Sequence, residues 1–284
     1  MIPNASIEDL QRWLRQKLSA GSDTPGLDAQ VLLGHIFERS RSWVLAHPEA
    51  RLSSEQLHLL EKAITQLDQG VPLPYVLSHW EFYGLDFIVT PDTLIPRPET
   101  ELLVEKALEW LGARPTCRLA ADVGTGSGCI AVTLARHVSD LRVLASDVSL
   151  PALRIASRNA RRQAVSDRID FLNADLLPPI CTRFDLICAN LPYIPSQVLQ
   201  GLEISGKEPD LALNGGPDGM DLVRALLYAA PQYLAPGGLV LLEIDSAQGN
   251  EAGKLAERSF PGARIEILPD LAGQDRLVTV QTQF

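Results

Sequence analysis

Two stretches within the first seventy residues repeat apolar side chains at helical spacing: Leu10, Trp13, Leu14 and Leu18 in the first, and Leu57, Leu60, Ile64 and Leu67 in the second. A helix built on either stretch has one apolar face, which must pack against another element. Ser6 and Ser53 precede the two runs as N-caps, and Gly21 and Gly70 follow them as helix ends. The pattern predicts a small helical bundle over residues 1–75.

The period of the apolar positions changes between residues 76 and 98. Apolar side chains alternate with other residues on both sides of Gly84, and prolines surround the segment. Alternation around a glycine is typical of two short antiparallel strands. We therefore expect a β-hairpin connector over residues 76–98.

From residue 99 onward, apolar strand candidates alternate with amphipathic helices. The strand candidates are residues 118–123, 142–147, 169–173, 184–189, 239–244, 264–268 and 277–283. Such alternation predicts an α/β fold, a Rossmann-like open sheet of parallel strands with helices on both faces. Only a short loop separates the last two candidates, so we expect them to form an antiparallel pair at one edge. The sheet domain is predicted to span residues 99–284.

Composition and charge narrow the possible partners. Hydrophobic residues make up 46% of the chain and the formal net charge is −10. This balance is typical of a folded globular protein and repels polyphosphate, which argues against a protein whose main task is to grip nucleic acid. Neither a signal peptide nor a membrane span is visible, and the histidines have no metal-ligand spacing. The four cysteines form no CxxC pair and have apolar neighbours, so we expect buried thiols in a cytoplasmic protein: Cys117, Cys129, Cys181 and Cys188.

A glycine-rich loop ends the first predicted strand of the sheet and opens the next helix. It consists of Gly124, Thr125, Gly126, Ser127 and Gly128. Glycine lets the backbone turn sharply and approach a ligand closely, and a helix N-terminus adds unpaired amides. The GxGxG spacing differs from that of dinucleotide folds, and no P-loop lysine follows. The loop predicts a nucleotide-like cofactor, with a plain glycine-rich turn as the alternative.

Two aspartates lie where the next two predicted strands end. Asp147 follows the glycines at about the twenty-residue distance at which a carboxylate accepts hydrogen bonds from the ribose hydroxyls of an adenosine. Asp175 could accept from the exocyclic amine of adenine while Leu176 covers the ring, although a helix or turn cap would also explain Asp175. Since nothing here is basic enough to bind a pyrophosphate, these positions favour S-adenosylmethionine over NAD.

The fourth predicted strand runs directly into the tetrad Asn190, Leu191, Pro192 and Tyr193. The Asn190 amide oxygen and the Leu191 carbonyl can each accept a hydrogen from one planar NH2 group, with the Tyr193 ring against its flat side. Pro192 keeps the backbone out of helical geometry. Two acceptors aimed at the N–H bonds stabilise the positive charge that builds on nitrogen during attack on a sulfonium methyl. The tetrad predicts methyl transfer to an amide or amino nitrogen; the alternative is a proline turn with a buried aromatic ring.

Together these residues resemble the HemK-type protein-glutamine N5-methyltransferases, which act on peptide chain release factors. Besides the loop and the tetrad, the motifs that carry the resemblance are residues 94–101, 208–209, 212–213, 215–219, 242–244 and 270–276. The family usually has Asn-Pro-Pro-Tyr, and Leu191 replaces the first proline here. Because the group required at that position is a backbone carbonyl, the change of side chain should be tolerated.

The resemblance implies a class I methyltransferase that uses S-adenosylmethionine and leaves S-adenosylhomocysteine. The methyl acceptor would be the glutamine of the Gly-Gly-Gln motif in class 1 release factors, with Asn190 and Tyr193 as the chief active-site residues. The N-terminal bundle would help to dock the release factor, with no direct binding of nucleic acid or membrane. Arg97 and Glu99 would lie near the cofactor pocket; a surface salt bridge or a helix cap explains them about as well.

Two other functions stay open from the sequence. The rRNA adenine N6-dimethyltransferases often have the tetrad Asn-Leu-Pro-Tyr. In those enzymes the glycine loop lies near the start of the chain and a basic helical domain follows the sheet. Here the extension comes first, and residues 1–80 contain 7 Lys or Arg against 9 Asp or Glu, so they form no basic surface for RNA. The arginines between residues 154 and 162 are interpreted as a solvated helix face. The second alternative is a non-catalytic protein adaptor that binds adenosylmethionine or no ligand. The presence of an intact glycine loop together with Asp147 and Asn190 argues against this alternative.

Overall fold

The computed structural model describes residues 5–177, 179 and 181–283, and the chain divides into two compact units. The first unit is Met1–Ser78 and the second is His79–Phe284. The hairpin that we expect between the two domains falls in the second unit. Residues 1–4 and 284, which we assigned to the outer ends of the bundle and the sheet domain, lie outside the described residues.

The first unit consists of helices, as the apolar spacing predicts. The Ser6 hydroxyl accepts a hydrogen bond from the backbone of Asp9, and Ser53 forms a reciprocal capping box with Gln56. Leu10, Leu14, Leu60 and Ile64, from the two predicted faces, are buried. The helices are α1 (Ile7–Leu18), α2 (Pro25–Phe37), α3 (Arg41–Ala46), α4 (Ser54–Asp68) and α5 (Leu73–Leu77).

The second unit opens with the predicted hairpin, made of β1 (His79–Phe82) and β2 (Leu85–Ile88). Phe82 and Leu85 are paired in register, so the turn between the strands contains two residues. Both of these residues, Tyr83 and Gly84, have positive φ angles of 52° and 70°. Positive φ at both positions matches the right-handed twist of the flanking strands, which explains the tight connection.

A seven-stranded sheet forms the centre of the second unit, in the order β5-β4-β3-β6-β7-β9-β8. The first five strands in this order are parallel, and β9 runs antiparallel to both of its neighbours. The predicted α/β sheet and its antiparallel edge pair are therefore confirmed, with β7 starting five residues earlier than expected. The strands are β3 (Leu119–Val123), β4 (Arg142–Asp147), β5 (Ile169–Asn173), β6 (Phe184–Asn190), β7 (Leu234–Glu243), β8 (Arg264–Pro269) and β9 (Asp275–Gln281).

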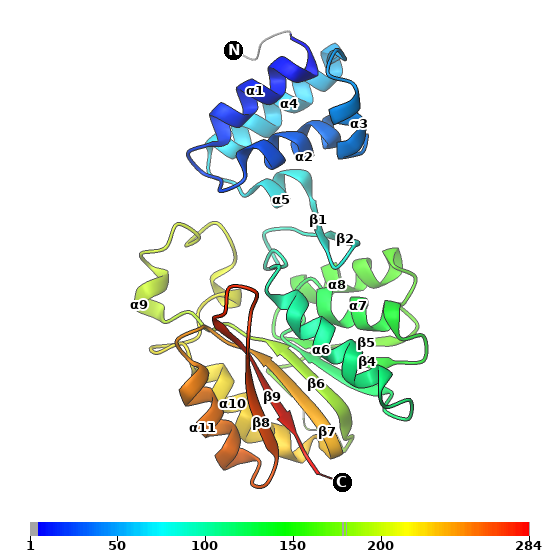
Figure 1. The fold of residues 1–284 in the computed structure, drawn as a ribbon, viewed down its shortest axis with the longest axis vertical. Helices are drawn as coiled ribbons and strands as arrows, with labels where there is room; N and C mark the ends of the chain where they lie inside the picture. The colour runs from blue at the N-terminus through cyan, green and yellow to red at the C-terminus, as the bar shows by residue number, and fades with distance from the viewer. Residues whose placement is uncertain (1–4, 178, 180, 284) are drawn as a thin grey trace. The chain divides into compact units, whose positions relative to one another are not determined.

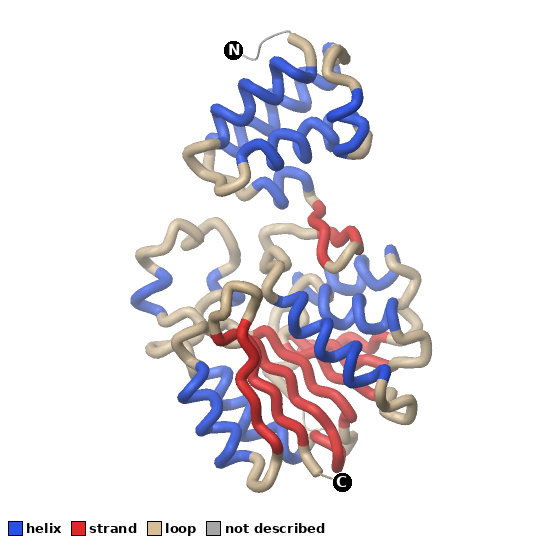
Figure 2. Tube along the Cα trace, in the orientation of Figure 1, coloured by secondary structure: helices blue, strands red, loops and turns tan. Residues whose placement is uncertain are grey.

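Helices cover both faces of this sheet (Figures 1 and 2). One hydrophobic cluster lies under α6, α7 and α8, and a second lies under α10 and α11. None of the helices in the described part of the chain is long and apolar enough to cross a bilayer. The helical segments are α6 (Thr100–Gly112), α7 (Cys129–His137), α8 (Leu150–Arg162), α9 (Ser196–Leu199), η1 (Asp210–Ala212), α10 (Asp221–Ala229), η2 (Ala230–Gln232) and α11 (Gly249–Ser259).

The direction of winding reverses beside β3. The chain passes from β3 through β4 to the edge strand β5, and then returns to place β6 on the other side of β3. In open α/β sheets, the crevice at the carboxyl ends of the strands on either side of such a reversal is where ligands bind. Gly124 follows β3 and Asn190 ends β6, so the glycine loop and the tetrad meet at this crevice.

One expectation about the cysteines is wrong. Cys188 is buried in β6, but Cys181 is exposed, and Cys117 and Cys129 are only partly covered. Cys181 itself lies between β5 and β6, outside any strand or helix. Burial of a thiol depends on the packing of the element that carries it, which local composition alone does not specify.

Candidate active site

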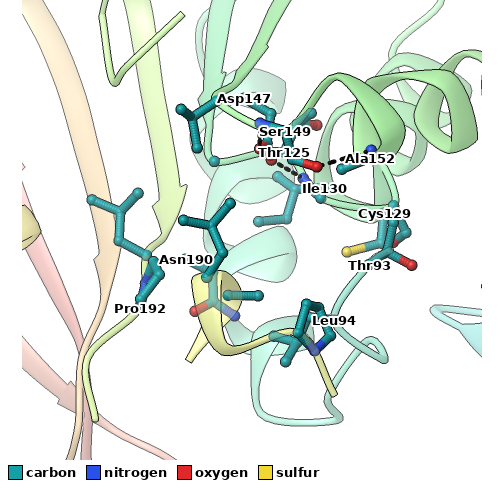
Figure 3. A pocket seen from close by; sticks show the side chains of 18 of the residues that line it. Thr93, Leu94, Thr125, Cys129, Ile130, Asp147, Ser149, Ala152, Asn190 and Pro192 are labelled. Carbon is teal, nitrogen blue, oxygen red and sulfur yellow. Dashed lines mark hydrogen bonds between the residues drawn. The ribbon is translucent and has the colours of Figure 1, made fainter. Parts of the chain in front are cut away.

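A cavity of about 330 Å³ opens at the carboxyl ends of β3, β4 and β6. Figure 3 shows side chains from separate segments around it: Asp147 at the end of β4 with Ser149 beyond it, Asn190 at the end of β6 with Pro192 beyond it, and Leu94 from the loop that precedes α6. The lining includes residues 92–94, 96–97, 100, 124–127, 129–130, 147–149, 152, 174–176, 190–192, 209, 211–212 and 222. Most of the predicted site residues are therefore brought together.

The glycine loop is held by a buried carboxylate that the sequence analysis did not single out. Asp122 in β3 accepts hydrogen bonds through Oδ2 from the Thr125 hydroxyl at 2.6 Å and from the backbone N–H of Ala131 at 3.0 Å. Burial raises the pKa of Asp122 to about 6. The carboxylate links the loop to the first turn of α7, which fixes the shape of the cavity wall. An acidic residue inside an otherwise apolar strand was the signal in the sequence.

Asp147 also ties the loop to the neighbouring strand. Its Oδ2 accepts from the backbone N–H of Gly126 at 2.9 Å, and its Oδ1 accepts from the backbone N–H of Ser149 at 2.8 Å. Burial raises the pKa of Asp147 above its usual range. Each carboxylate oxygen has a second lone pair, so Asp147 can still accept from a ligand while it orients the loop.

Asp175 and Leu176 both line the cavity, in the segment after β5. The Ser146 hydroxyl donates a hydrogen bond to the Leu176 carbonyl at 2.9 Å. Leu176 has φ of 54°, a left-handed conformation that is costly for a branched side chain. The contact from β4 helps to hold this strained backbone in place, so that both side chains stay at the cavity.

Three members of the tetrad line the cavity: Asn190, Leu191 and Pro192. The Asn190 amide donates through Nδ2 to the Thr100 hydroxyl at 2.9 Å. The Leu191 side chain is buried and apolar, so the backbone carbonyl is the group of this residue that can accept a hydrogen bond from a ligand. Because the nitrogen side of the Asn190 amide faces Thr100, the amide oxygen is directed away from Thr100 and remains available as an acceptor.

Tyr193 does not belong to the described lining of the cavity. Its hydroxyl donates toward Oε1 of Glu243 at 3.4 Å, and its backbone carbonyl accepts from the Gln248 side chain at 3.0 Å. Burial and the neighbouring Glu243 carboxylate raise the pKa of Tyr193 well above its usual range. Tyr193 is therefore a neutral side chain that is held next to Glu243, behind the residues that line the cavity.

Of the two residues before α6, only Arg97 lines the cavity. Its guanidinium donates to Oε1 of Glu208 at 2.5 Å, and Oε2 of Glu208 accepts from the backbone N–H of Ile95 at 3.0 Å. Glu208 is buried, whereas Glu99 is exposed at the start of α6. The Glu208 carboxylate thus holds residues 95–97 at the cavity wall, although Glu208 lies more than a hundred positions further along the chain.

Sequence reasoning from the residues alone also missed Thr100 and Glu243. Thr100 donates its hydroxyl hydrogen to Oε2 of Glu243 at 2.7 Å, and both side chains are almost completely buried. Burial raises the pKa of Glu243 to about 7. A glutamate that ends the apolar strand β7 was a visible signal, but nothing in the sequence shows that Thr100 lies against it.

The charges of the lining fit a cationic adenosine derivative. Asp92, Asp147 and Asp175 contribute carboxylates, while Arg97, the one basic residue in the described lining, is already paired with Glu208. Such a lining attracts a positively charged ligand and offers a diphosphate no free basic side chain. S-adenosylmethionine carries a sulfonium and an ammonium group and has no phosphate, so the residues present fit it.

Solved structures share the fold at low sequence identity. A methyltransferase from Pyrococcus furiosus superposes with a TM-score of 0.52 and 20% identity, over 82% of this chain and 100% of that one. The Thermus thermophilus 16S rRNA N2 G1207 methyltransferase, solved with AdoMet and guanosine, gives a TM-score of 0.51 and 19% identity, over 72% of this chain and 50% of its own. The fold and the site together define the protein as a class I S-adenosylmethionine-dependent methyltransferase.

Sequence comparison makes the assignment more specific. Residues 9–77 match the PrmC N-terminal domain, and residues 99–201 match the methyltransferase small domain. The release factor glutamine methyltransferase of Moorella thermoacetica is 42% identical over 93% of both chains, and that of Nitratidesulfovibrio vulgaris is 38% identical over 97% of this chain and 95% of its own. The chain belongs to the release factor glutamine methyltransferase family. The enzyme class and methyl donor predicted from the sequence are confirmed.

Proposed function

We propose that this chain transfers a methyl group from S-adenosylmethionine to the side-chain amide nitrogen of the glutamine in the Gly-Gly-Gln motif of class 1 peptide chain release factors. The observation that carries the proposal is the hydrogen bond from Asn190 Nδ2 to Thr100, at the carboxyl end of β6. This bond leaves the Asn190 oxygen as an acceptor beside the Leu191 carbonyl. Two such acceptors suit the two N–H bonds of a primary amide.

When bound, S-adenosylmethionine supplies an electrophilic methyl group on its sulfonium. With that group bound, the amide nitrogen of glutamine would form the new N–C bond as the S–C bond breaks, the electron pair of the S–C bond would stay on sulfur in S-adenosylhomocysteine, and one N–H proton would pass to water. Asn190 and the Leu191 carbonyl hold the N–H bonds so that the nitrogen faces the methyl group, and they stabilise the positive charge that develops on it. Tyr193 serves as an active-site residue by supporting this corner from the side of Glu243.

The cofactor would lie along the glycine loop. Asp147 would accept from the ribose hydroxyls, Asp175 would accept from the adenine amine, and Leu176 would cover the adenine ring; all three line the cavity. Arg97, held in place by its ion pair with Glu208, would form the neighbouring wall of the cofactor site. Glu99 would lie close to this wall, at the start of α6. The glycine loop would supply the backbone surface under the nucleoside: Gly124, Thr125, Gly126 and Ser127 line the cavity, whereas Gly128, at the start of α7, does not belong to the described lining.

The helical first unit is proposed to dock the release factor in the cytoplasm. Residues 9–77 match the PrmC N-terminal domain, and the release factor glutamine methyltransferases of Moorella thermoacetica and Nitratidesulfovibrio vulgaris align with 93% and 97% of this chain, which supports a role of this unit in substrate binding. Residues 1–75 would then supply the contact surface for the protein substrate, and residues 99–284 would carry out the methyl transfer. The catalytic unit alone should retain cofactor binding and lose most of its affinity for the release factor.

The proposal is tested by incubating the full chain with S-adenosylmethionine labelled in its methyl group. We expect label in a class 1 release factor and none in a release factor whose Gly-Gly-Gln glutamine is replaced by alanine. Transfer to rRNA in place of the release factor would identify an rRNA adenine dimethyltransferase. Cofactor binding with transfer to neither substrate would identify a non-catalytic adaptor. Either of these two results would overturn the proposal.

A further inference from the structure

A buried series of hydrogen bonds joins Asn190 to Glu243 through Thr100. Asn190 Nδ2 donates to Thr100 Oγ1 at 2.9 Å, and Thr100 Oγ1 donates to Glu243 Oε2 at 2.7 Å. The three residues come from the end of β6, the start of α6 and the end of β7. Thr100 is 2% exposed and Glu243 is 1% exposed, so water does not compete for these bonds.

The chemistry of the three groups gives this series a direction. An ionised carboxylate only accepts hydrogen bonds, and a threonine hydroxyl has a single hydrogen to donate. Once that hydrogen is given to Glu243, the Thr100 oxygen can only accept, and it accepts from the NH2 group of Asn190. The amide oxygen of Asn190 must then face away from Thr100.

We propose that Thr100 and Glu243 are positioning residues, which keep the amide oxygen of Asn190 directed at the N–H bonds of the methyl acceptor. The inference rests on the proposed function, because it assumes that Asn190 receives a hydrogen from the substrate nitrogen. It goes further by assigning the orientation of that amide to a carboxylate that does not line the cavity.

Protonation of Glu243 allows the series to reverse. A carboxylic acid can donate to Thr100, whose hydroxyl is then free to donate to the Asn190 oxygen. The amide of Asn190 would rotate and present its own N–H bonds to the NH2 group of the substrate, where two donors repel each other. Because burial raises the pKa of Glu243 to about 7, this reversal falls within the range of an activity assay.

Several ionisable groups surround Glu243. Tyr193 donates toward its other oxygen, Arg276 faces it from β9, and Glu99 approaches from the start of α6. The pKa of Arg276 is raised by its acidic neighbours, and that of Tyr193 is raised by burial, so both keep their protons near neutral pH. The contact with Arg276 lowers the pKa of Glu243, whereas the charge of Glu99 raises it.

On the side of α7, the Cys129 thiol interacts with Glu243, and burial raises the pKa of this thiol to about 12. Cys129 also interacts with Asp122, whose pKa is about 6. Asp122 is therefore the neighbouring group whose titration must be separated from that of Glu243. A pH profile of the Glu243 variant makes this separation.

The first test removes and restores the hydroxyl of Thr100 in the full chain, with a release factor as substrate. Thr100→Val keeps the shape of the side chain and should lower kcat by about 10- to 100-fold, because a misdirected amide loses much of its effect on the reaction. Thr100→Ser returns the hydroxyl and should recover most of kcat. The KM for S-adenosylmethionine should change by less than about threefold in both variants, since the effect lies on the acceptor.

Thr133→Val is the matched control. Thr133 in α7 is also buried, but its hydroxyl has no hydrogen-bond partner in the described structure and it does not line the cavity. This variant should have the kcat of the unmodified chain. A Thr100→Val variant that is as active as Thr133→Val would overturn the inference.

The second test is the pH profile of Glu243→Gln. In the unmodified chain kcat should fall on the acid side with a midpoint near pH 7, and in Glu243→Gln kcat should be lower and lack this step, because a neutral amide can face either way. A step that persists in the variant belongs to Asp122 and would contradict the role of Glu243. If Glu243→Gln does not fold, the comparison of the Thr100 variants decides alone. Failure of the unmodified chain to methylate the release factor would overturn the proposed function instead, which separates the two claims.

Discussion

A Cβ atom placed on Gly124 would lie 2.9 Å from Cδ2 of Leu191. The glycine loop and the tetrad therefore pack in direct contact, with no space for a side chain on the first loop residue. Gly124 also has φ of 73°, in the region that glycine adopts without strain. Position 124 therefore needs glycine for two independent reasons: the positive φ and the close contact with Leu191. Leu191 is the residue that replaces the family's usual proline.

We expect Gly124→Ala to weaken the binding of S-adenosylmethionine by at least about tenfold and to lower the free energy of unfolding by roughly 1–3 kcal/mol. The added methyl group must displace Leu191 and also strain the backbone. Calorimetric titration and urea unfolding measure the two effects. Gly126→Ala is the control, because Gly126 has a positive φ of 56° but nothing within 4 Å of its would-be Cβ.

The contact itself is tested by combining Gly124→Ala with Leu191→Ala. Removing the side chain of Leu191 should recover part of the cofactor affinity that Gly124→Ala loses. Equal losses in Gly124→Ala and Gly126→Ala, with no recovery in the double variant, would mean that backbone strain alone explains the requirement for glycine.

Asn190→Ala should reduce kcat by about 100- to 1000-fold, the range seen when one preorganised polar contact to a transition state is removed. The dissociation constant of S-adenosylmethionine should stay within about threefold, since Asn190 acts on the acceptor nitrogen. Steady-state transfer to a release factor and equilibrium binding of the cofactor provide the two measurements. Transfer at the original rate would contradict the assigned role.

Asp147→Asn should weaken S-adenosylmethionine binding by about 10- to 100-fold. Both oxygens of Asp147 accept from backbone N–H groups, so an amide in its place directs an NH2 group at one of these donors. Asp175→Asn should cost less, because Asp175 is exposed. A larger loss for Asp175→Asn in the same titration would reverse the importance assigned to the two carboxylates.

Glu208→Gln should lower the free energy of unfolding by about 1–3 kcal/mol. The substitution leaves the guanidinium of Arg97 without its buried counter-charge and weakens the bond to the Ile95 backbone. Asp218→Asn breaks an exposed ion pair with Arg224 and should change the unfolding free energy by less than about 0.5 kcal/mol. Denaturant curves that show equal effects for the two variants would place no special value on the buried pair.

Tyr193→Phe should retain kcat within about threefold, because the hydroxyl contact to Glu243 is long at 3.4 Å and the ring is kept. Tyr193→Ala should lower kcat far more, since it removes the ring that supports the corner. Both rates are measured at saturating cofactor. A severe loss in Tyr193→Phe would assign the contribution to the hydroxyl and to its bond with Glu243.

The elements of the second unit could be predicted well because each has a strong local pattern. The strands of the sheet alternate with amphipathic helices, and Gly84 sits in a turn for which positive φ is needed. The sequence predicts a later start for β7 than the structure shows, because Ala235, Pro236 and the two glycines that follow are not typical of a strand. Pairing with β6 at Phe184 overrides this local preference.

The site could be predicted only where its residues follow a strand in sequence. Asp147 and Asn190 end parallel strands, and topology alone sends both to the same crevice. The contacts that hold the site could not be found in this way, because they join distant segments: Thr100 bonds to Asn190 across 90 positions, and Glu208 bonds to the Ile95 backbone across 113 positions. Tyr193 follows the same strand, yet the backbone after Pro192 turns it toward Glu243.

Asn190, Thr100 and Glu243 are separated by 90 and 143 positions along the chain. Closing contacts of such sequence separation costs loop-closure entropy, which is repaid only when the elements that carry them pack together. An incompletely assembled sheet could therefore present the glycine loop, and even retain the methyl donor, without an oriented amide to receive a substrate. Methyl transfer therefore requires that β6, β7 and the start of α6 are all packed together, whereas the carboxylate bonds that hold the glycine loop need only β3, β4 and α7.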